Sequence, residues 1–218
     1  MLKRYSNLTG ILISLTLLFV ATLYYPGGSQ HDRNSIGYDW KNNYLSNLFG
    51  KEAVNVSNNL TSRAWASCGV FFLCRAIATF FWQFSKRIPV KSAAVVIKYP
   101  GLCASIFAFL AVTSFHDLMV TLSGTCALVA VFYVTVCLFK SKLGFIKIFP
   151  VVFLLFFYCC NFVYYTRIYL ELLSVMQKIL LLLTITWVLY LEYFAIAADF
   201  QLKKNIQPAV GNDSAASQ

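Results

Sequence analysis

Long apolar runs constrain this chain more than any other feature of its sequence. Six of them approach the roughly 20 residues that an α-helix needs to cross a hydrocarbon core about 30 Å thick. These runs are Thr9–Tyr25, Ala64–Phe84, Tyr99–Phe115, Leu118–Phe139, Phe145–Thr166 and Leu172–Phe200. We therefore predict an all-α fold, a polytopic membrane protein built as a six-transmembrane-helix bundle.

The composition fits a chain dissolved in lipid. Hydrophobic residues make up 59% and charged residues 12%, whereas soluble domains contain about 25% charged residues. The formal charge of +10 is divided among short clusters between the apolar runs, unlike the single basic face of a nucleic-acid binder. We expect membrane lipids and no nucleic acid as partners, and a protein partner or homo-oligomer stays open. The seven cysteines form no CxxC pair, and no motif predicts a cofactor.

The distribution of lysine and arginine predicts the orientation. One side of the predicted bundle would carry eleven cations, and the other six cations against five acids. The cation-rich set is Lys3, Arg4, Lys86, Arg87, Lys91, Lys98, Lys140, Lys142, Lys147, Lys203 and Lys204. We predict that this side, with both termini, is cytoplasmic. The predicted organisation is a transmembrane domain over 1–204, with an outer loop over 26–63, followed by a disordered cytoplasmic tail over 205–218.

The outer loop carries a helix-like pattern between residues 38 and 49. Trp40, Tyr44 and Leu48 recur at four-residue intervals, which predicts an amphipathic helix lying in the membrane interface. A polar stripe on another face comprises Asp39, Asn43, Ser46 and Asn47. Either this helix only caps the bundle, or its polar stripe holds a lipid headgroup or a metal ion.

Each of the two histidines is followed by an aspartate, as His31-Asp32 and His116-Asp117. The predicted topology places both pairs on the outer side. Imidazole beside carboxylate can perform acid–base chemistry near neutral pH and can bind zinc. His116, Asp117 and Asp39 are therefore candidate catalytic residues, and His31, Asp32, His116 and Asp117 are candidate metal ligands. The alternatives are a solvated loop residue for His31 and a helix cap for Asp117.

Two charges lie inside predicted membrane spans. Arg75 and Glu192 each precede a cytoplasmic lysine by eleven residues, which places both at about 16 Å above that side. Because a lone charge in lipid is costly, we predict an Arg75–Glu192 ion pair that fixes the helix register. Nearer the outer side, Arg167 and Lys178 are either contacts for lipid phosphate or ordinary interfacial cations.

Three short segments share a pattern with one family of membrane proteins. Tyr25-Pro26-Gly27-Gly28 follows the first run, the segment 44–50 lies in the outer loop, and His116-Asp117 opens the fourth run ahead of Gly124. In these segments the chain resembles the DRAM/Sfk-type six-helix membrane proteins and their uncharacterised bacterial relatives, with Asn47 where the family motif has Asp. The resemblance implies a six-helix bundle with a structured outer loop and a link to membrane-lipid homeostasis, but no reaction common to the group.

These features support three hypotheses about function. In the first, the protein binds or senses membrane lipid at its outer face, in a non-catalytic accessory or lipid-homeostasis role. Its headgroup site would comprise Asp39, Asn43, Asn47, His116 and Arg167. In the second, it is an outward-facing lipid hydrolase or transferase, with His116 as general base and Ser46 as a candidate nucleophile. In the third, it transports a small solute along a polar path through the bundle.

Overall fold

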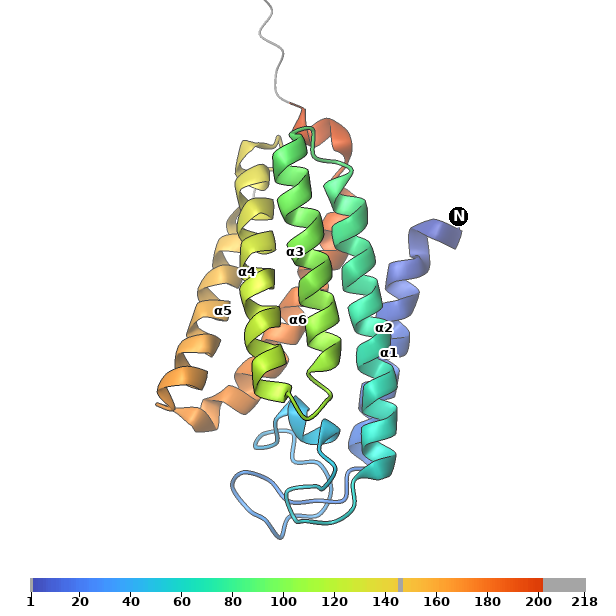
Figure 1. Ribbon diagram of the computed structural model, residues 1–218, viewed down its shortest axis with the longest axis vertical. Helices are drawn as coiled ribbons and strands as arrows, with labels where there is room; N and C mark the ends of the chain where they lie inside the picture. Colours follow the sequence, from blue (N-terminus) through green and yellow to red (C-terminus); the bar gives the residue numbers. More distant parts are fainter. Residues whose placement is uncertain (1, 145–146, 202–218) are drawn as a thin grey trace, which may run out of the picture.

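The computed structural model describes residues 2–144 and 147–201. Six α-helices follow one another along the chain, joined mostly by short turns (Figure 1). Their bounds are α1 Leu2–Leu23, α2 Leu60–Ser85, α3 Lys91–Leu110, α4 His116–Lys140, α5 Ile148–Thr166 and α6 Leu170–Phe194. All six are long and apolar enough to cross a membrane, so the six-helix bundle is confirmed and the chain is a multi-pass membrane protein.

The two ends of the bundle differ in construction. The start of α1 and the end of α6 lie at one end, which we call the termini end (Figure 1). The long segment between α1 and α2 folds at the opposite end, which we call the loop end. This arrangement matches the predicted alternation of the spans. The predicted tail over 205–218 lies outside the described residues.

The bounds of several helices differ from those of the predicted apolar runs. α3 begins at Lys91 instead of Tyr99, because the residues before the apolar run also form helix. Pro100 therefore lies inside α3 and not at its start. Pro150 lies in the first turn of α5, where its missing N–H costs no hydrogen bond. α6 ends at Phe194 because Ala195 adopts extended backbone, and the 3-10 turn η3 (Ala197–Phe200) follows it.

Small residues let α2 approach both of its neighbours in sequence. A Cβ on Gly69 would lie 3.2 Å from the Ser14 carbonyl oxygen of α1, and a Cβ on Gly101 of α3 would lie 2.3 Å from the Phe81 ring of α2. Close packing of this kind stabilises the association of helices in lipid, because the hydrophobic effect does not drive helices together there. These contacts therefore fix α1, α2 and α3 against one another.

Aromatic rings fill the centre of the bundle toward the termini end. Trp187 of α6 is almost fully buried and stacks on Phe153 of α5, with ring centroids 5.6 Å apart and an interplanar angle of 13°. Phe80 of α2 meets the same indole edge-on at 6.0 Å. Each such pair contributes about 0.5–1.5 kcal/mol beyond its buried area, so Trp187 joins α2, α5 and α6.

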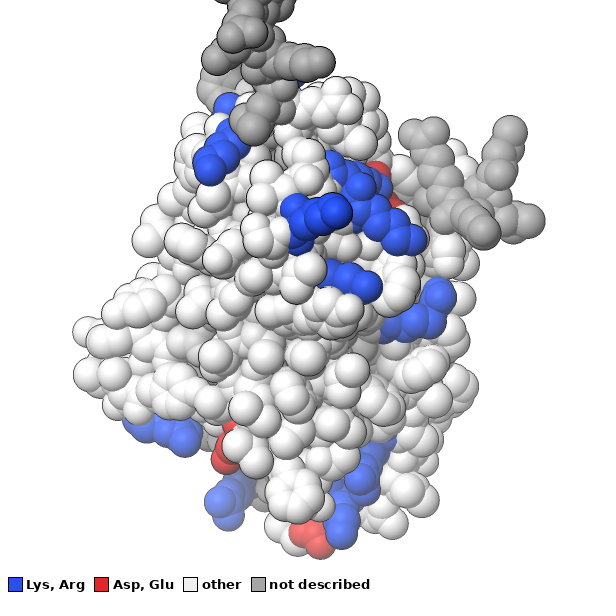
Figure 2. All heavy atoms as spheres, turned by 45° about the horizontal axis from the view of Figure 1, so that its top comes forward, with Lys and Arg blue, Asp and Glu red and all other residues white. Residues whose placement is uncertain are grey.

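Lysine and arginine side chains gather over the termini end (Figure 2). The described cations there are Lys86, Arg87, Lys91, Lys98, Lys140, Lys142 and Lys147. Arg87 is structural, because its guanidinium donates to the carbonyls of Leu191 at 2.7 Å, Ala195 at 2.8 Å and Glu192 at 3.1 Å. It thereby caps the C-terminal end of α6 with a charge that suits the helix dipole.

Candidate functional site

The loop between α1 and α2 folds back on itself at the loop end of the bundle. Backbone pairing joins Gly27 to Ile36, and the Gly28 N–H donates to the Ser35 carbonyl at 2.7 Å. Gly27 and Gly28 have φ values of 144° and 81°, which only glycine adopts without strain. The sequence Tyr25-Pro-Gly-Gly thus forms the predicted turn and starts an ordered loop.

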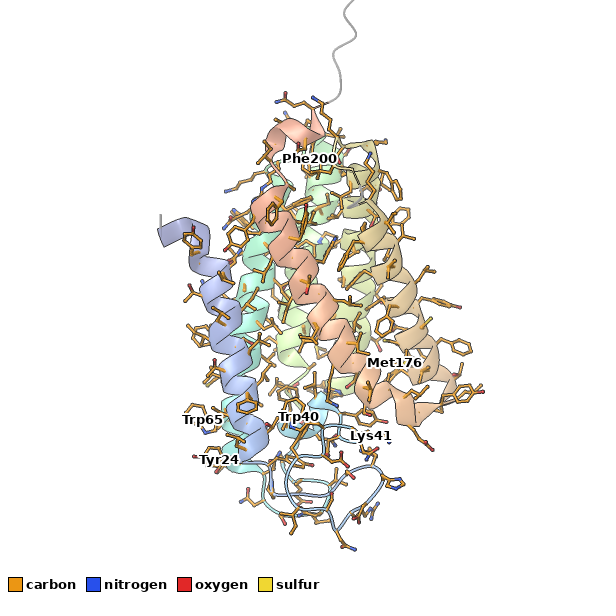
Figure 3. The ribbon with its side chains drawn as sticks, turned by 180° about the vertical axis from the view of Figure 1, so that it is seen from behind. Tyr24, Trp40, Lys41, Trp65, Met176 and Phe200 are labelled. Carbon is orange, nitrogen blue, oxygen red and sulfur yellow. The ribbon has the colours of Figure 1, made fainter. Side chains whose placement is uncertain are left out.

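The predicted amphipathic helix is present only in part. A single 3-10 turn, η1, spans Leu45–Phe49, and residues 38–44 form turns instead of a helix. Trp40 stacks over Phe19 of α1 with ring centroids 6.4 Å apart, and the side chain of Leu48 in η1 is fully buried. The four-residue spacing therefore arises from a loop that wraps its apolar residues over α1 and α2 (Figure 3).

Two buried asparagines hold the loop together. The Asn43 side chain, fully buried, donates to the Gly28 carbonyl at 2.9 Å and accepts from the Asp39 N–H at 2.8 Å. The Asn59 Nδ2, also buried, donates to the carbonyls of Asn47, Leu48 and Gly50 at 3.1–3.3 Å. Buried backbone groups need such partners, so both amides are structural.

The remaining predicted headgroup residues of the loop are likewise occupied. The Asn47 side chain accepts from the Tyr44 N–H at 2.6 Å. The Asp39 carboxylate accepts from Asn42 Nδ2 at 2.7 Å and from the Lys41 N–H at 2.9 Å. These bonds, the Asn42 side chain first, hold the pKa of Asp39 below its ordinary value, although partial burial works in the opposite direction.

Helix α6 anchors the loop to the bundle. Lys178 Nζ donates to the Asn43 carbonyl at 2.7 Å and to the Ser174 carbonyl at 2.9 Å, and it lies 5.7 Å from the Tyr38 ring centroid. The Ser174 hydroxyl donates to the Lys41 carbonyl, and Lys41 lies beside the start of α6 in Figure 3. Burial raises the pKa of the Tyr38 phenol well above its ordinary value. Lys178, for which the sequence left open a phosphate contact or an ordinary interfacial cation, is thus a loop anchor.

Arg167 differs from the other predicted headgroup residues because its side chain is exposed and its donors have no acceptor among the described residues. It is the C-cap of α5, with a left-handed φ of 61°, and Tyr169 follows with φ 57°. The guanidinium lies over the Tyr164 ring, 5.3 Å from the centroid. Within the described part of the chain, it donates no side-chain hydrogen bond and forms no ion pair.

The turn between α5 and α6 borders an open depression on the surface. Its lining comprises Arg167, Tyr169, Leu170, Glu171 and Leu172. Tyr44 connects the loop to this turn, because its hydroxyl donates to the Leu170 carbonyl at 3.4 Å. Burial raises the pKa of the Tyr44 phenol, and the nearby charge of Arg167 works in the opposite direction. Arg167 therefore faces the rim of the loop from across the turn.

The second His-Asp pair is divided between two structural contacts. His116 Nδ1 lies 2.6 Å from the Ala111 carbonyl oxygen, so this nitrogen donates a hydrogen bond to the carbonyl. Asp117 accepts instead from the Tyr164 hydroxyl of α5 at 2.9 Å. The carboxylate thus joins α4 to α5 and does not orient the imidazole beside it.

The first His-Asp pair lies at the exposed tip of the loop. His31 is exposed, and Asp32 accepts from the Asn34 N–H at 2.9 Å in a local turn. Across residues 2–144 and 147–201, no three His, Cys, Asp or Glu side chains gather closely enough to hold a metal ion. The described structure therefore does not bring the candidate ligands His31, Asp32, His116 and Asp117 together as a metal site.

The predicted Arg75–Glu192 ion pair is not formed. Glu192 accepts from Asn7 Nδ2 of α1 at 3.2 Å, whereas the Arg75 guanidinium lies against Gly10, where a Cβ would be 3.2 Å from Nη2. Glu192 and Arg75 thus contact α1 at positions only three residues apart, which agrees with the prediction that both lie at a similar depth in the membrane. The prediction was wrong about the side of its helix on which each charge lies, because counting residues along a helix gives the depth and not this direction.

Sequence reasoning missed Ser174 and Asn59, and it did not foresee that Lys178 anchors the loop. Asn59 stands directly before α2, a position typical of a cap, so its structural role had a weak signal. The contacts of Ser174 and Lys178 with residues 41 and 43 span more than 130 positions and leave no local pattern. Comparisons with protein-family models, with curated proteins and with solved structures find no match to this chain, and the DRAM/Sfk resemblance stays a prediction.

Proposed function

We propose that this protein binds the headgroup of a membrane phospholipid, without catalysis, at the turn between α5 and α6. The observation that carries the proposal is Arg167, an exposed guanidinium whose donors find no acceptor among the described residues. The fork of an arginine side chain matches the geometry of phosphate oxygens and can donate two parallel hydrogen bonds.

The backbone at Arg167 argues that the side chain has a use. A left-handed C-cap is ordinarily glycine, and a residue with a Cβ there costs roughly 1–2 kcal/mol. Tyr169 repeats this conformation two residues later. Strained residues of this kind concentrate at binding sites, and glycine at position 167 would end α5 with less strain.

The surroundings of Arg167 suit a headgroup that carries one positive and one negative charge. Glu171 lines the same depression and offers a carboxylate to an ammonium group, while Arg167 meets the phosphate. Tyr169 is 73% exposed and Leu172 56% exposed. Tyrosine is favoured at headgroup depth, and the leucine side chain faces the acyl region. The chemistry fits a zwitterionic phospholipid.

The sidedness of this site follows from the cation bias. The sequence predicts eleven lysines and arginines on the side of the termini and six on the opposite side, and cytoplasmic segments carry the excess of lysine and arginine. In our proposal, both termini are cytoplasmic and the α5–α6 turn meets the opposite leaflet.

Native mass spectrometry of protein released from mild detergent tests the proposal. Wild type should retain one phospholipid per chain, and Arg167→Gln should retain about tenfold less, since a bidentate arginine–phosphate contact is worth roughly 1.4 kcal/mol or more. Arg33→Gln, an exposed arginine of the same end, is the matched control and should behave as wild type. Equal retention by Arg167→Gln and wild type would reject the site.

A further inference from the structure

Arg75 lies deep in a membrane span and points to its outside. It is ten residues before the end of α2 at Ser85, about 15 Å along the helix axis. Ala64, Cys68, Phe71 and Trp82 are exposed, and their spacings of four, three, four and seven residues place them on one face with Arg75. This face is turned away from α6 and the aromatic core.

No group of the described chain neutralises Arg75. Its guanidinium forms no side-chain hydrogen bond and no ion pair within residues 2–144 and 147–201, and the nearest feature of α1 is Gly10. Glu192, the acid nearest in depth, is bonded to Asn7 and interacts with the charge of Arg87. Arg75 is therefore a cation at mid-membrane depth without a counter-charge among the described residues.

The cost of such a charge is substantial. An arginine at the centre of a transmembrane helix disfavours insertion by roughly 2.5–3.5 kcal/mol on experimental scales, and such residues almost always pair or face a wet cavity. No carboxylate of the described residues forms an ion pair with Arg75. A partner that supplies a negative charge at this depth would remove the cost.

We infer that the exposed face of α2 receives a transmembrane helix of another protein that carries an aspartate or glutamate at mid-membrane depth. Ala64 and Cys68 are small exposed residues on this face, and the half-buried Ala78 lies beside it; small residues let helices approach closely in lipid. Charge complementarity sets the register, because the partner carboxylate must reach the Arg75 guanidinium.

A second copy of this chain does not fit the same role. Among the described residues, the other acids lie in the loop, in the first turns of α4 and α6, or in η3. Glu192 is the sole described acid within the middle of a span, and it is already bonded to Asn7. A homodimer would thus bring no free carboxylate to Arg75.

The test uses a synthetic single-span helix of leucine and alanine with one central glutamate. Donor-labelled protein and acceptor-labelled peptide are reconstituted together in liposomes, and energy transfer measures their association. The glutamate peptide should bind wild type about tenfold more tightly than the same peptide with glutamine, since polar contacts between helices in lipid are worth about 1–2 kcal/mol. Arg75→Gln should remove this preference.

Two variants guard the interpretation. Arg75→Lys keeps the cation and should keep most of the preference, so a folding defect in Arg75→Gln cannot be mistaken for lost pairing. Arg63→Gln changes an arginine in the first turn of the same helix and should leave the preference intact. Equal binding of both peptides to wild type would overturn the inference. So would a wild-type homodimer that Arg75→Gln dissociates, because the occupant would then be a second copy.

Discussion

Two arginines beside helix C-termini show how differently the two ends of this molecule use their charge. At the termini end, Arg87 distributes its donors over three carbonyls at the end of α6. At the loop end, Arg167 terminates α5 in a left-handed conformation, and its donors have no acceptor in the described chain. The first arginine completes a helix, and the second, in our proposal, binds a lipid headgroup.

The comparison extends to the polar residues around each arginine. The loop contributes asparagines and an aspartate whose side chains are already bonded to backbone, so it is a folded platform instead of a set of binding groups. Its anchor, Lys178, draws it onto α6. Our proposal therefore places the headgroup site at the α5–α6 turn and not in the loop.

The largest effect is expected from removing the buried amide of the platform. Asn43→Ala leaves the Gly28 carbonyl and the Asp39 N–H without partners in a fully buried position. We expect a loss of about 3 kcal/mol and a fall of about 10 °C in the thermal unfolding midpoint, measured by scanning fluorimetry in detergent. The exposed Asn34→Ala serves as control. A shift below about 1 °C, well under that expectation, would show that the loop does not stabilise the bundle.

Arg87→Ala should have the next largest effect. It removes three hydrogen bonds from a charged donor to the last carbonyls of α6, worth about 2 kcal/mol together after solvent replaces part of the contact. Lys86→Ala, whose neighbouring ammonium lies 5.4 Å from the Trp82 ring centroid, is the matched control. Unfolding midpoints that fall equally in both variants would remove the structural role given to Arg87.

Arg167→Gly separates stability from binding at the loop end. Glycine removes the strain of the left-handed conformation but raises the conformational entropy of the unfolded chain. The variant should therefore be as stable as wild type or more stable by up to about 1 kcal/mol. Lipid retention should nevertheless fall. A variant that is clearly less stable than wild type would mean that Arg167, like Arg87, serves the fold.

The smallest effect concerns acid and the Asp39 turn. Because hydrogen bonds lower the folded-state pKa of Asp39, its contribution is complete above the unfolded pKa of about 3.9 and is lost as pH falls through the lower folded value. The group is largely exposed, so the effect should stay below about 1 kcal/mol. The midpoint difference between wild type and Asp39→Asn should be constant above about pH 5 and shrink toward about pH 3. Glu52→Gln is the control, and a difference unchanged at low pH would contradict the assignment.

The sequence was sufficient for the bundle because hydrophobic length is a local property. Each of the six spans could be recognised from its own residues. Boundaries shifted where polar residues extended a helix, as at Lys91, or where extended backbone ended it, as at Ala195. The paired depths of Arg75 and Glu192 also followed from counting along each helix. Their failure to pair reflects rotation about the helix axes, which is set by packing against α1.

The loop was less accessible to sequence reasoning, because its contacts are distant in sequence. Asn43 was predicted to face a ligand, yet it is buried against Gly28 and covered by Lys178 of α6. A polar residue that satisfies buried backbone and one that awaits a ligand look alike in sequence. Arg167, by contrast, was among the predicted headgroup residues, and its left-handed backbone could not be foreseen.

Photocrosslinking with a phospholipid that carries a photoreactive headgroup tests the central claim most directly. Labelled peptides from residues 164–172 are quantified against those from residues 82–98, so the cation-rich termini end serves as an internal standard. We predict strong labelling of the α5–α6 turn in wild type, and its selective loss in Arg167→Gly while the internal standard is unchanged. Equal labelling of the turn in both proteins would contradict a headgroup site built on Arg167.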